Sequence, residues 1–278
     1  MSTTKEENTK EVIATLAQQF YGLGWFPGSG GSLTIRENPD RIFIAPSGVQ
    51  KERIKAEDIF ILNAKAQVVE RPPLDHLRPS QCTPLFMVAY NGNNYFVVLL
   101  FYLWPHHDFY ECYFFPFNAE RPEVKAVIHS HDPNVVLASM LYKGNEFKIK
   151  NQHMIKVSFF NPLFLPSCLV IQITFEYHVA FFKKQGIFNN VEGRPGFFDE
   201  ELVVPIVENA REDYMLCDSV AQAIRDYPQA NAVILRHHGI HIWGRSWQQC
   251  KLMAESYHYL LAMAVEMHKC GINPYTIE

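Results

Sequence analysis

Residues 124–133 read VKAVIHSHDP, and this stretch carries the strongest signal for the fold. A compact run of β-branched and small apolar residues predicts a buried strand over 124–128. Asp132 suits the position that caps a helix, and Pro133 suits the first turn of that helix. We therefore expect a buried strand that ends in His129-Ser130-His131 and leads directly into a helix.

Strands and helices interleave on both sides of this stretch. Hydrophobic periodicity and turn residues predict further strands at 33–35, 42–44, 59–62, 201–207, 232–235 and 240–243, and helices at 11–23, 80–90, 213–227 and 246–270. Several strands follow one another closely enough to pair as hairpins. The pattern predicts a single α/β domain over residues 1–278, with three α/β/α layers and a mostly antiparallel central sheet.

Two stretches rich in aromatic residues do not fit this pattern. Residues 91–117 and 157–185 hold many of the 21 phenylalanines and 13 tyrosines, without clean helical or alternating periodicity. Each is long enough for a membrane span, but each contains proline, histidine and acidic residues, which argues against one. We interpret both as interruptions of the domain that arise from translation of retained introns, with real insertions as the alternative.

Charge and cysteine content bear on partners and location. Charged residues make up 19% of the chain and the formal net charge is −4, so no basic surface for nucleic acid is expected. The six cysteines include no C-x-x-C pair, which favours reduced thiols over a disulfide framework. The polar first residues lack the apolar core of a secretory signal. We expect a cytoplasmic protein that contacts neither nucleic acid nor membrane.

Histidines at the ends of two predicted strands suggest a metal site. Residues two apart on a strand share a face, so His129 and His131 can reach the same ion. His238, in the turn between two later strands, offers a third ligand. Three protein ligands leave a position open for water or substrate, as in catalytic zinc sites, although imidazole also suits other divalent metals. Polar residues that merely close their strands are the alternative.

Two loops carry groups that suit a phosphate. Residues 28–32 read GSGGS, and glycines let backbone N–H groups approach an anion closely. Ser47 and Gly48, followed by Lys51, offer a second set of donors with a cation. A plain turn is the alternative for the first loop. If both loops lie near the metal, the site suits a phosphorylated sugar.

Several longer strings resemble one known family. They are FYGLGW at 20–25, IAPSGVQKERI at 44–54, CTPLFMVAY at 82–90, AVIHSH at 126–131, ELVVPIVEN at 201–209 and RHHGIHIWG at 236–244. Together they resemble the class II aldolase and adducin family, and within it the members that dehydrate methylthioribulose 1-phosphate. The resemblance covers nearly the whole chain apart from the two aromatic-rich stretches.

This resemblance implies a class II aldolase-like fold, a homotetramer with sites near subunit interfaces, and one zinc ion per subunit. The zinc ligands that it implies are His129, His131 and His238. The positions that it and the loops assign to a small sugar phosphate are Gly30, Gly31, Ser47, Gly48, Lys51, Gln81 and Cys82.

The implied activity is zinc-dependent dehydration of 5-methylthioribulose 1-phosphate to 2,3-diketo-5-methylthiopentyl 1-phosphate, a step of methionine salvage. The family carries a glutamate as acid/base in a motif resembling QEMIKG, whereas residues 152–156 read QHMIK here. Imidazole moves protons near neutral pH, so we expect His153 to act as the catalytic acid/base. A class II aldolase or epimerase on another sugar phosphate, and an adducin-like binding protein without catalysis, are the alternatives.

Overall fold

A computed structural model describes residues 9–91, 95–101, 110–116, 121–156 and 187–274 of the chain. Nine of its strands form one sheet in the order β4-β3-β2-β1-β7-β13-β12-β11-β8. Their bounds are β1 Ser32–Asn38, β2 Arg41–Ile44, β3 Phe60–Leu62, β4 Val68–Glu70, β7 Ala126–Ser130, β8 Glu146–Ile149, β11 Leu202–Val207, β12 Ala232–Leu235 and β13 Gly239–Gly244. All neighbours pair antiparallel except β11 and β12, which pair parallel.

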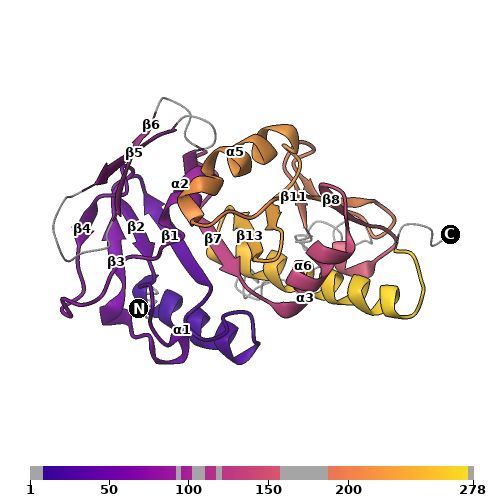
Figure 1. The fold of residues 1–278 in the computed structure, drawn as a ribbon, viewed down its shortest axis with the longest axis horizontal. Coiled ribbons are helices and arrows are strands. Elements are labelled where there is room, and N and C mark those ends of the chain that lie inside the picture. The colour runs from indigo at the N-terminus through magenta and orange to yellow at the C-terminus, as the bar shows by residue number, and fades with distance from the viewer. Residues whose placement is uncertain (1–8, 92–94, 102–109, 117–120, 157–186, 275–278) are drawn as a thin grey trace, which may run out of the picture.

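Helices cover both faces of this sheet. Ala126 and Ile128 of β7 face the layer formed by α1 Thr9–Gly22, α3 Pro133–Leu141 and α6 Trp247–Lys269. Val127, between them, faces the layer formed by α2 Thr83–Asn91 and α5 Cys217–Asp226. Figure 1 shows α2 and α5 on one side of the strands and α1, α3 and α6 on the other. The alternation of strand residues therefore produces the three α/β/α layers that the sequence predicts.

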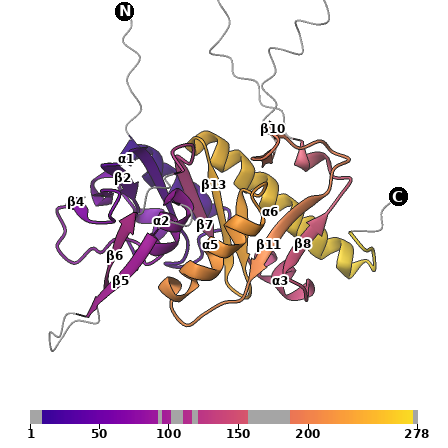
Figure 2. The same ribbon diagram turned by 90° about the horizontal axis from the view of Figure 1, so that it is seen from above.

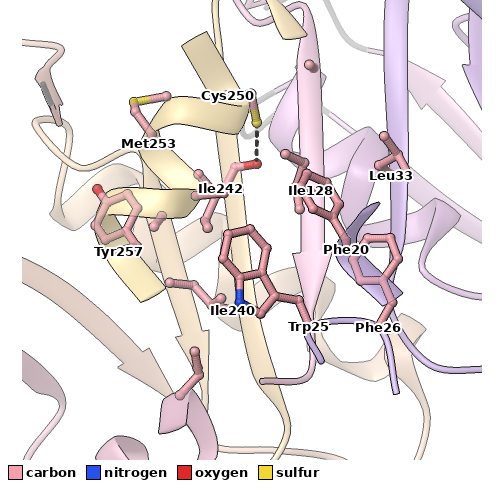
Figure 3. Packing of buried hydrophobic residues seen from close by; sticks show 14 of the residues in the cluster. Phe20, Trp25, Phe26, Leu33, Ile128, Ile240, Ile242, Cys250, Met253 and Tyr257 are labelled. Carbon is pink, nitrogen blue, oxygen red and sulfur yellow. Dashed lines mark hydrogen bonds between the residues drawn. The ribbon is translucent and has the colours of Figure 1, made fainter. Parts of the chain in front are cut away.

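An aromatic cluster joins α1 to the centre of the sheet. The Phe20 ring at the end of α1 lies 5.2 Å from the rings of both Trp25 and Phe26. Figure 3 shows this cluster beside the isoleucines of β13, where Cys250 of α6 hydrogen-bonds the carbonyl of Ile242. These side chains are buried, so the chain that leaves α1 is held against β7 and β13.

Most predicted elements are confirmed within one or two residues. The helix predicted at 213–227 starts as a 3-10 turn, η5 Asp213–Leu216, and continues as α5. Strands β4 and β8 were not predicted. β8 is four residues long and lies at the sheet edge, where its side chains are only alternately buried. The remaining short elements are the 3-10 turns η1 Lys51–Arg53, η2 Ala56–Asp58 and η3 His153–Ile155, and the two-residue strands β9 Phe188–Asn189 and β10 Arg194–Pro195.

The aromatic-rich stretches lie largely outside the described residues, including all of 157–185. Within 91–117, β5 Tyr95–Phe101 and β6 Tyr110–Pro116 pair antiparallel only with each other and add no strand to the nine-stranded sheet. Figure 2 shows this hairpin projecting from the body of the molecule. The backbone N–H of Arg121 donates to the carbonyl of Tyr90 at 2.9 Å, so the chain leaves and re-enters the domain at one place.

Candidate metal centre

Three imidazoles converge where β7 ends beside β13. One ring nitrogen from each of His129, His131 and His238 lies within 4.8 Å of the others. The ring centroids are 4.6 to 5.0 Å apart and the rings stand steeply to one another. Nitrogens at this spacing surround a point that one divalent ion can occupy. The sequence therefore identified a set of histidines that the fold brings together.

Close contact between β7 and β13 produces this convergence. His129 pairs with His241 across the two strands, and Ser130 pairs with Ile240. A side chain at Gly239 would place its Cβ 2.0 Å from the carbonyl oxygen of Ser130. Only glycine permits this approach, which brings His238 beside the end of β7.

Hydrogen bonds fix which nitrogen is free in two of the three rings. The Nδ1 of His129 lies 3.2 Å from the carbonyl oxygen of Ile240, and the Nδ1 of His238 lies 3.2 Å from Oδ1 of Asn209. These oxygens only accept, so both Nδ1 atoms carry the proton and donate. The Nε2 lone pairs of His129 and His238 are thereby left for an ion, as expected for imidazole ligands that are oriented by outer contacts. The Nε2 of His131 lies 2.7 Å from the Nε2 of His129, so the third ring turns the same atom toward this point.

Burial keeps these imidazoles neutral. Burial lowers the pKa of His129 well below its usual value, and neighbouring imidazoles add to the effect. Burial likewise lowers the pKa of His131 to about 4 and lowers that of His238. Metal binding requires deprotonated imidazole, so the set is ready to bind near neutral pH. Three neutral imidazoles fit zinc and also other divalent ions that accept nitrogen ligands.

Arg236 clamps the turn that carries His238. Its guanidinium donates to the carbonyls of Ser139, Tyr142 and Gly144 around the end of α3, and it pairs with Glu208 at 2.6 Å. The next residue, His237, has a left-handed φ of 59°, and its N–H donates to the Ser139 hydroxyl at 3.0 Å. The turn is therefore held from α3, which follows β7 directly.

Several of the predicted substrate residues lie beside the cluster. A Cβ at Gly30 would lie 2.6 Å from Nδ1 of His131, so the glycine-rich loop touches the metal centre. The Lys51 Nζ is buried and donates to the carbonyl of Pro46 at 3.0 Å. Burial lowers the pKa of Lys51 to about 8, although the nearby Cys82 thiol raises it. The Lys51 charge also lowers the pKa of His131. Lys51 therefore lies near enough to both Cys82 and the cluster to act on their charges.

The other predicted residues lie in the turn after Pro46, in the glycine-rich loop, just before α2 and in η3. Ser47 and Gly48 form the turn next to Pro46, and the N–H of Ser47 donates to the Arg78 carbonyl. Gly31 packs against the Phe26 ring, and Gln81 is exposed. His153 is exposed in η3, and the described residues include no recorded contact between His153 and the three-histidine cluster.

The structure also brings residues to the site that the sequence analysis missed. Asp213 of η5 hydrogen-bonds the Cys82 thiol, whose pKa is raised chiefly by burial, and it raises the pKa of His238 against the effect of burial. Its position at the start of a predicted helix was the only signal. His241 of β13 is buried and stacks on His129, with ring centroids 3.9 Å apart.

A family model also matches this chain. The model described as the class II aldolase and adducin N-terminal domain matches residues 11–101 and 112–265. The chain belongs to the class II aldolase and adducin family. The matched residues include all three histidines of the cluster, so the candidate metal centre lies inside the family's domain.

Named relatives in this family match almost end to end. A protein of Drosophila grimshawi named "Probable methylthioribulose-1-phosphate dehydratase" is 35% identical over 98% of this chain and 94% of its own length. A protein of Osmerus mordax named "Methylthioribulose-1-phosphate dehydratase" is 36% identical over 97% of this chain and 88% of its own.

Solved structures of similar fold agree with the architecture of this chain. An L-fuculose 1-phosphate aldolase superposes with a TM-score of 0.60 at 16% identity, covering 99% of this chain and 92% of its own. A sugar-phosphate aldolase of Thermotoga maritima gives 0.54 at 13% identity, covering 96% and 97%. At this identity the likeness concerns the class II aldolase fold alone.

Among the described residues, no helix is long and apolar enough to cross a membrane.

Proposed function

We propose that this chain is a zinc-dependent dehydratase that removes water from 5-methylthioribulose 1-phosphate and forms 2,3-diketo-5-methylthiopentyl 1-phosphate, in methionine salvage. The observation that carries the proposal is the cluster of three neutral imidazoles in a chain 35% identical to named dehydratases. An aldolase or epimerase on another sugar phosphate, and a binding protein without catalysis, are the competing outcomes of the test below.

His129, His131 and His238 would hold the ion. When bound, a divalent cation supplies charge withdrawal from the substrate carbonyl, which acidifies the neighbouring C–H bond. The chain's own contribution is to orient the imidazoles through the Ile240 carbonyl and the Asn209 amide oxygen. It also keeps the imidazoles neutral by burial.

The phosphate end of the substrate is assigned to the loops beside His131. Gly30 and Gly31 present backbone in the glycine-rich loop, and Ser47 and Gly48 add a turn close to Lys51. Backbone N–H groups and a cation at one place suit a phosphate. Gln81 and Cys82, just before α2, would line the remainder of the substrate pocket. Holding the phosphate there fixes which carbons face the histidines.

His153 is proposed as the acid/base that removes the proton at C3 and assists departure of the C4 hydroxyl. Its exposed position in η3 suits a surface where two subunits meet, in line with the homotetramer that the resemblance implies. In that arrangement His153 of one subunit serves the cluster of another. Subunits that carry His153→Ala, mixed with subunits that carry His238→Ala, then regain part of the activity that each lacks alone.

We further propose that the protein works in the cytoplasm. The four described cysteines, Cys82, Cys217, Cys250 and Cys270, are all free thiols, which suits a reducing compartment.

The test is turnover by the purified, zinc-loaded full chain. Methylthioribulose 1-phosphate, fuculose 1-phosphate and ribulose 1-phosphate are supplied separately, and products are identified by mass spectrometry. We expect loss of one water from the first substrate and no cleavage of the others. His238→Ala should abolish this reaction, whereas Lys251→Ala, which removes an ion pair with Glu255 within α6, should not. Cleavage of a carbon–carbon bond would establish an aldolase, and no turnover of any substrate would favour a binding protein.

A further inference from the structure

His258 of α6 is a buried histidine that the proposed reaction does not use. Only 4% of its surface is exposed. It lies on the helical layer that covers the face of the sheet opposite to His129. Both of its ring nitrogens nevertheless make short hydrogen bonds, of 2.6 Å each, to the Ser130 hydroxyl and the Ala254 carbonyl.

These two partners define which ring nitrogen of His258 donates a hydrogen bond and which accepts one. The Ala254 carbonyl only accepts, so Nδ1 of His258 carries the proton and donates to it. Burial lowers the pKa of His258 to about 4, so the ring is neutral near pH 7 and its Nε2 accepts from the Ser130 hydroxyl. The Ser130 oxygen in turn accepts from the N–H of Asp132 at 3.2 Å.

Ser130 stands between two of the three proposed metal ligands. Strand alternation directs His129 to one face of the sheet and Ser130 to the other, so the serine meets α6 while the imidazole faces α2. β7 ends at Ser130, and His131 therefore lies just beyond the last strand residue. The direction in which the His131 side chain points depends on the backbone conformation of residues 130–132. Strand pairing alone does not fix this conformation, because the strand ends at Ser130.

A second contact ties His258 to the same segment. The indole of Trp25 stacks on the His258 ring, with centroids 3.8 Å apart and planes 11° from parallel. The carbonyl of Trp25 accepts the N–H of His131 at 2.9 Å. His258 thus hydrogen-bonds Ser130, the residue before His131. It also stacks on Trp25, whose carbonyl accepts the His131 N–H.

We propose that His258 is a positioning residue for the metal centre, fixing the backbone at the end of β7 from which His131 reaches the ion. The inference rests on the metal centre of the proposed function but not on the identity of the substrate. Outer contacts of this kind change metal affinity by about 10- to 100-fold when they are removed.

Three substitutions separate this role from simple packing. In His258→Gln the side-chain oxygen lies near the position of Nε2 and can still accept from Ser130. In His258→Asn the amide nitrogen lies near Nδ1, so the bond to Ala254 is retained and the bond to Ser130 is lost. Ser130→Ala removes the same bond from the other side at the cost of one hydroxyl. Tyr257→Phe, at the adjacent buried position of α6, is the matched control.

The experiment measures the Co²⁺ dissociation constant of the full chain by competition with a chromophoric chelator, together with the visible absorption of bound Co²⁺. We expect about 10- to 100-fold weaker binding and an altered Co²⁺ spectrum for His258→Asn and Ser130→Ala. The double variant should lose no more affinity than either single variant. His258→Gln and Tyr257→Phe should bind within about threefold of wild type, a difference below the range expected for outer contacts.

Other results overturn the inference in distinguishable ways. If His258→Asn and Ser130→Ala lower thermal stability but leave Co²⁺ affinity and spectrum unchanged, His258 is structural only and the proposed function stands. If His258→Gln loses as much affinity as His258→Asn, the bond to Ser130 is not the cause. A wild-type chain that binds no Co²⁺ removes the metal centre itself, and the inference falls with it.

Discussion

Gly239 shows how one residue controls the geometry of the candidate site. It follows His238 and begins β13, where its backbone lies against the Ser130 carbonyl. A methyl group at this position would meet backbone atoms of β7, which cannot move aside as a flexible side chain can. The strands would have to separate at the point where the three histidines converge.

Gly239→Ala is therefore expected to lower the free energy of unfolding by about 1–3 kcal/mol, the usual range for overpacking a tight site. It should also weaken metal binding, because His238 is displaced from His129 and His131. Gly144→Ala is a suitable control, since a Cβ there meets no atom within 4 Å. Urea unfolding and metal titration measure the two effects. An unchanged metal affinity would show that the β7–β13 contact does not set the position of His238.

A second prediction at this scale concerns His153. If this residue is the proton carrier that replaces the carboxylate implied by the family resemblance, His153→Glu restores that carboxylate and raises kcat for methylthioribulose 1-phosphate. The metal content should stay the same, because His153 is not one of the three histidines that would hold the ion. An unchanged kcat would mean that another group moves the proton.

At the scale of elements, buried imidazoles at the end of β7 and on α6 should make the stability of the fold sensitive to acid. Burial lowers the pKa of His131 and of His258 from 6.5 to about 4. Between these values an unfolded chain binds protons that the folded chain does not. The free energy of unfolding therefore falls as the pH drops through this window. The stability that these neutral imidazoles contribute is complete above about pH 6.5.

We expect the metal-free protein to lose stability steadily from about pH 6.5 to pH 4 in urea unfolding experiments. His258→Gln, which removes one of the buried imidazoles, should show a smaller loss over the same interval. Equal stability at both ends of the window would contradict neutral burial of these rings.

The elements also show what the sequence could and could not predict. The strand and helix at residues 124–133 could be predicted, because the apolar run, the capping Asp132 and Pro133 all indicate the same strand-to-helix boundary. β8 was missed because a four-residue edge strand carries little periodicity. Asn209, Asp213 and His258 reach the site through contacts 20 or more positions away in sequence. No local pattern marks such residues, because their role depends on the register of β7 with β13 and on the packing of α6.

At the scale of the whole molecule, the described residues that flank each aromatic-rich stretch lie close together. Arg121 donates to the carbonyl of Tyr90 at 2.9 Å, and Ile187 donates to the carbonyl of Ile155 at 3.1 Å. The described residues on either side of each stretch are therefore already in contact. We propose that the functional domain is continuous without 91–117 and 157–185, and that both derive from retained introns.

Deleting both stretches, which joins Tyr90 to Asn118 and Lys156 to Gly186, should leave a chain that folds and binds metal as the full chain does. Thermal unfolding and metal titration of the two proteins test this. A shortened chain that aggregates while the full chain stays folded would show that the stretches are structural. Independently, transcripts that all retain both segments would rule out the intron origin.

The account as a whole depends on one ion held by His129, His131 and His238. The most direct measurement is metal content by mass spectrometry of the extensively dialysed chain, beside His129→Ala and His238→Ala variants that retain the folded circular dichroism spectrum. The account predicts close to one zinc ion per chain in the wild type and a near-complete loss in both variants. Retention of the same zinc content by either variant, or its absence from a folded wild type, would contradict it.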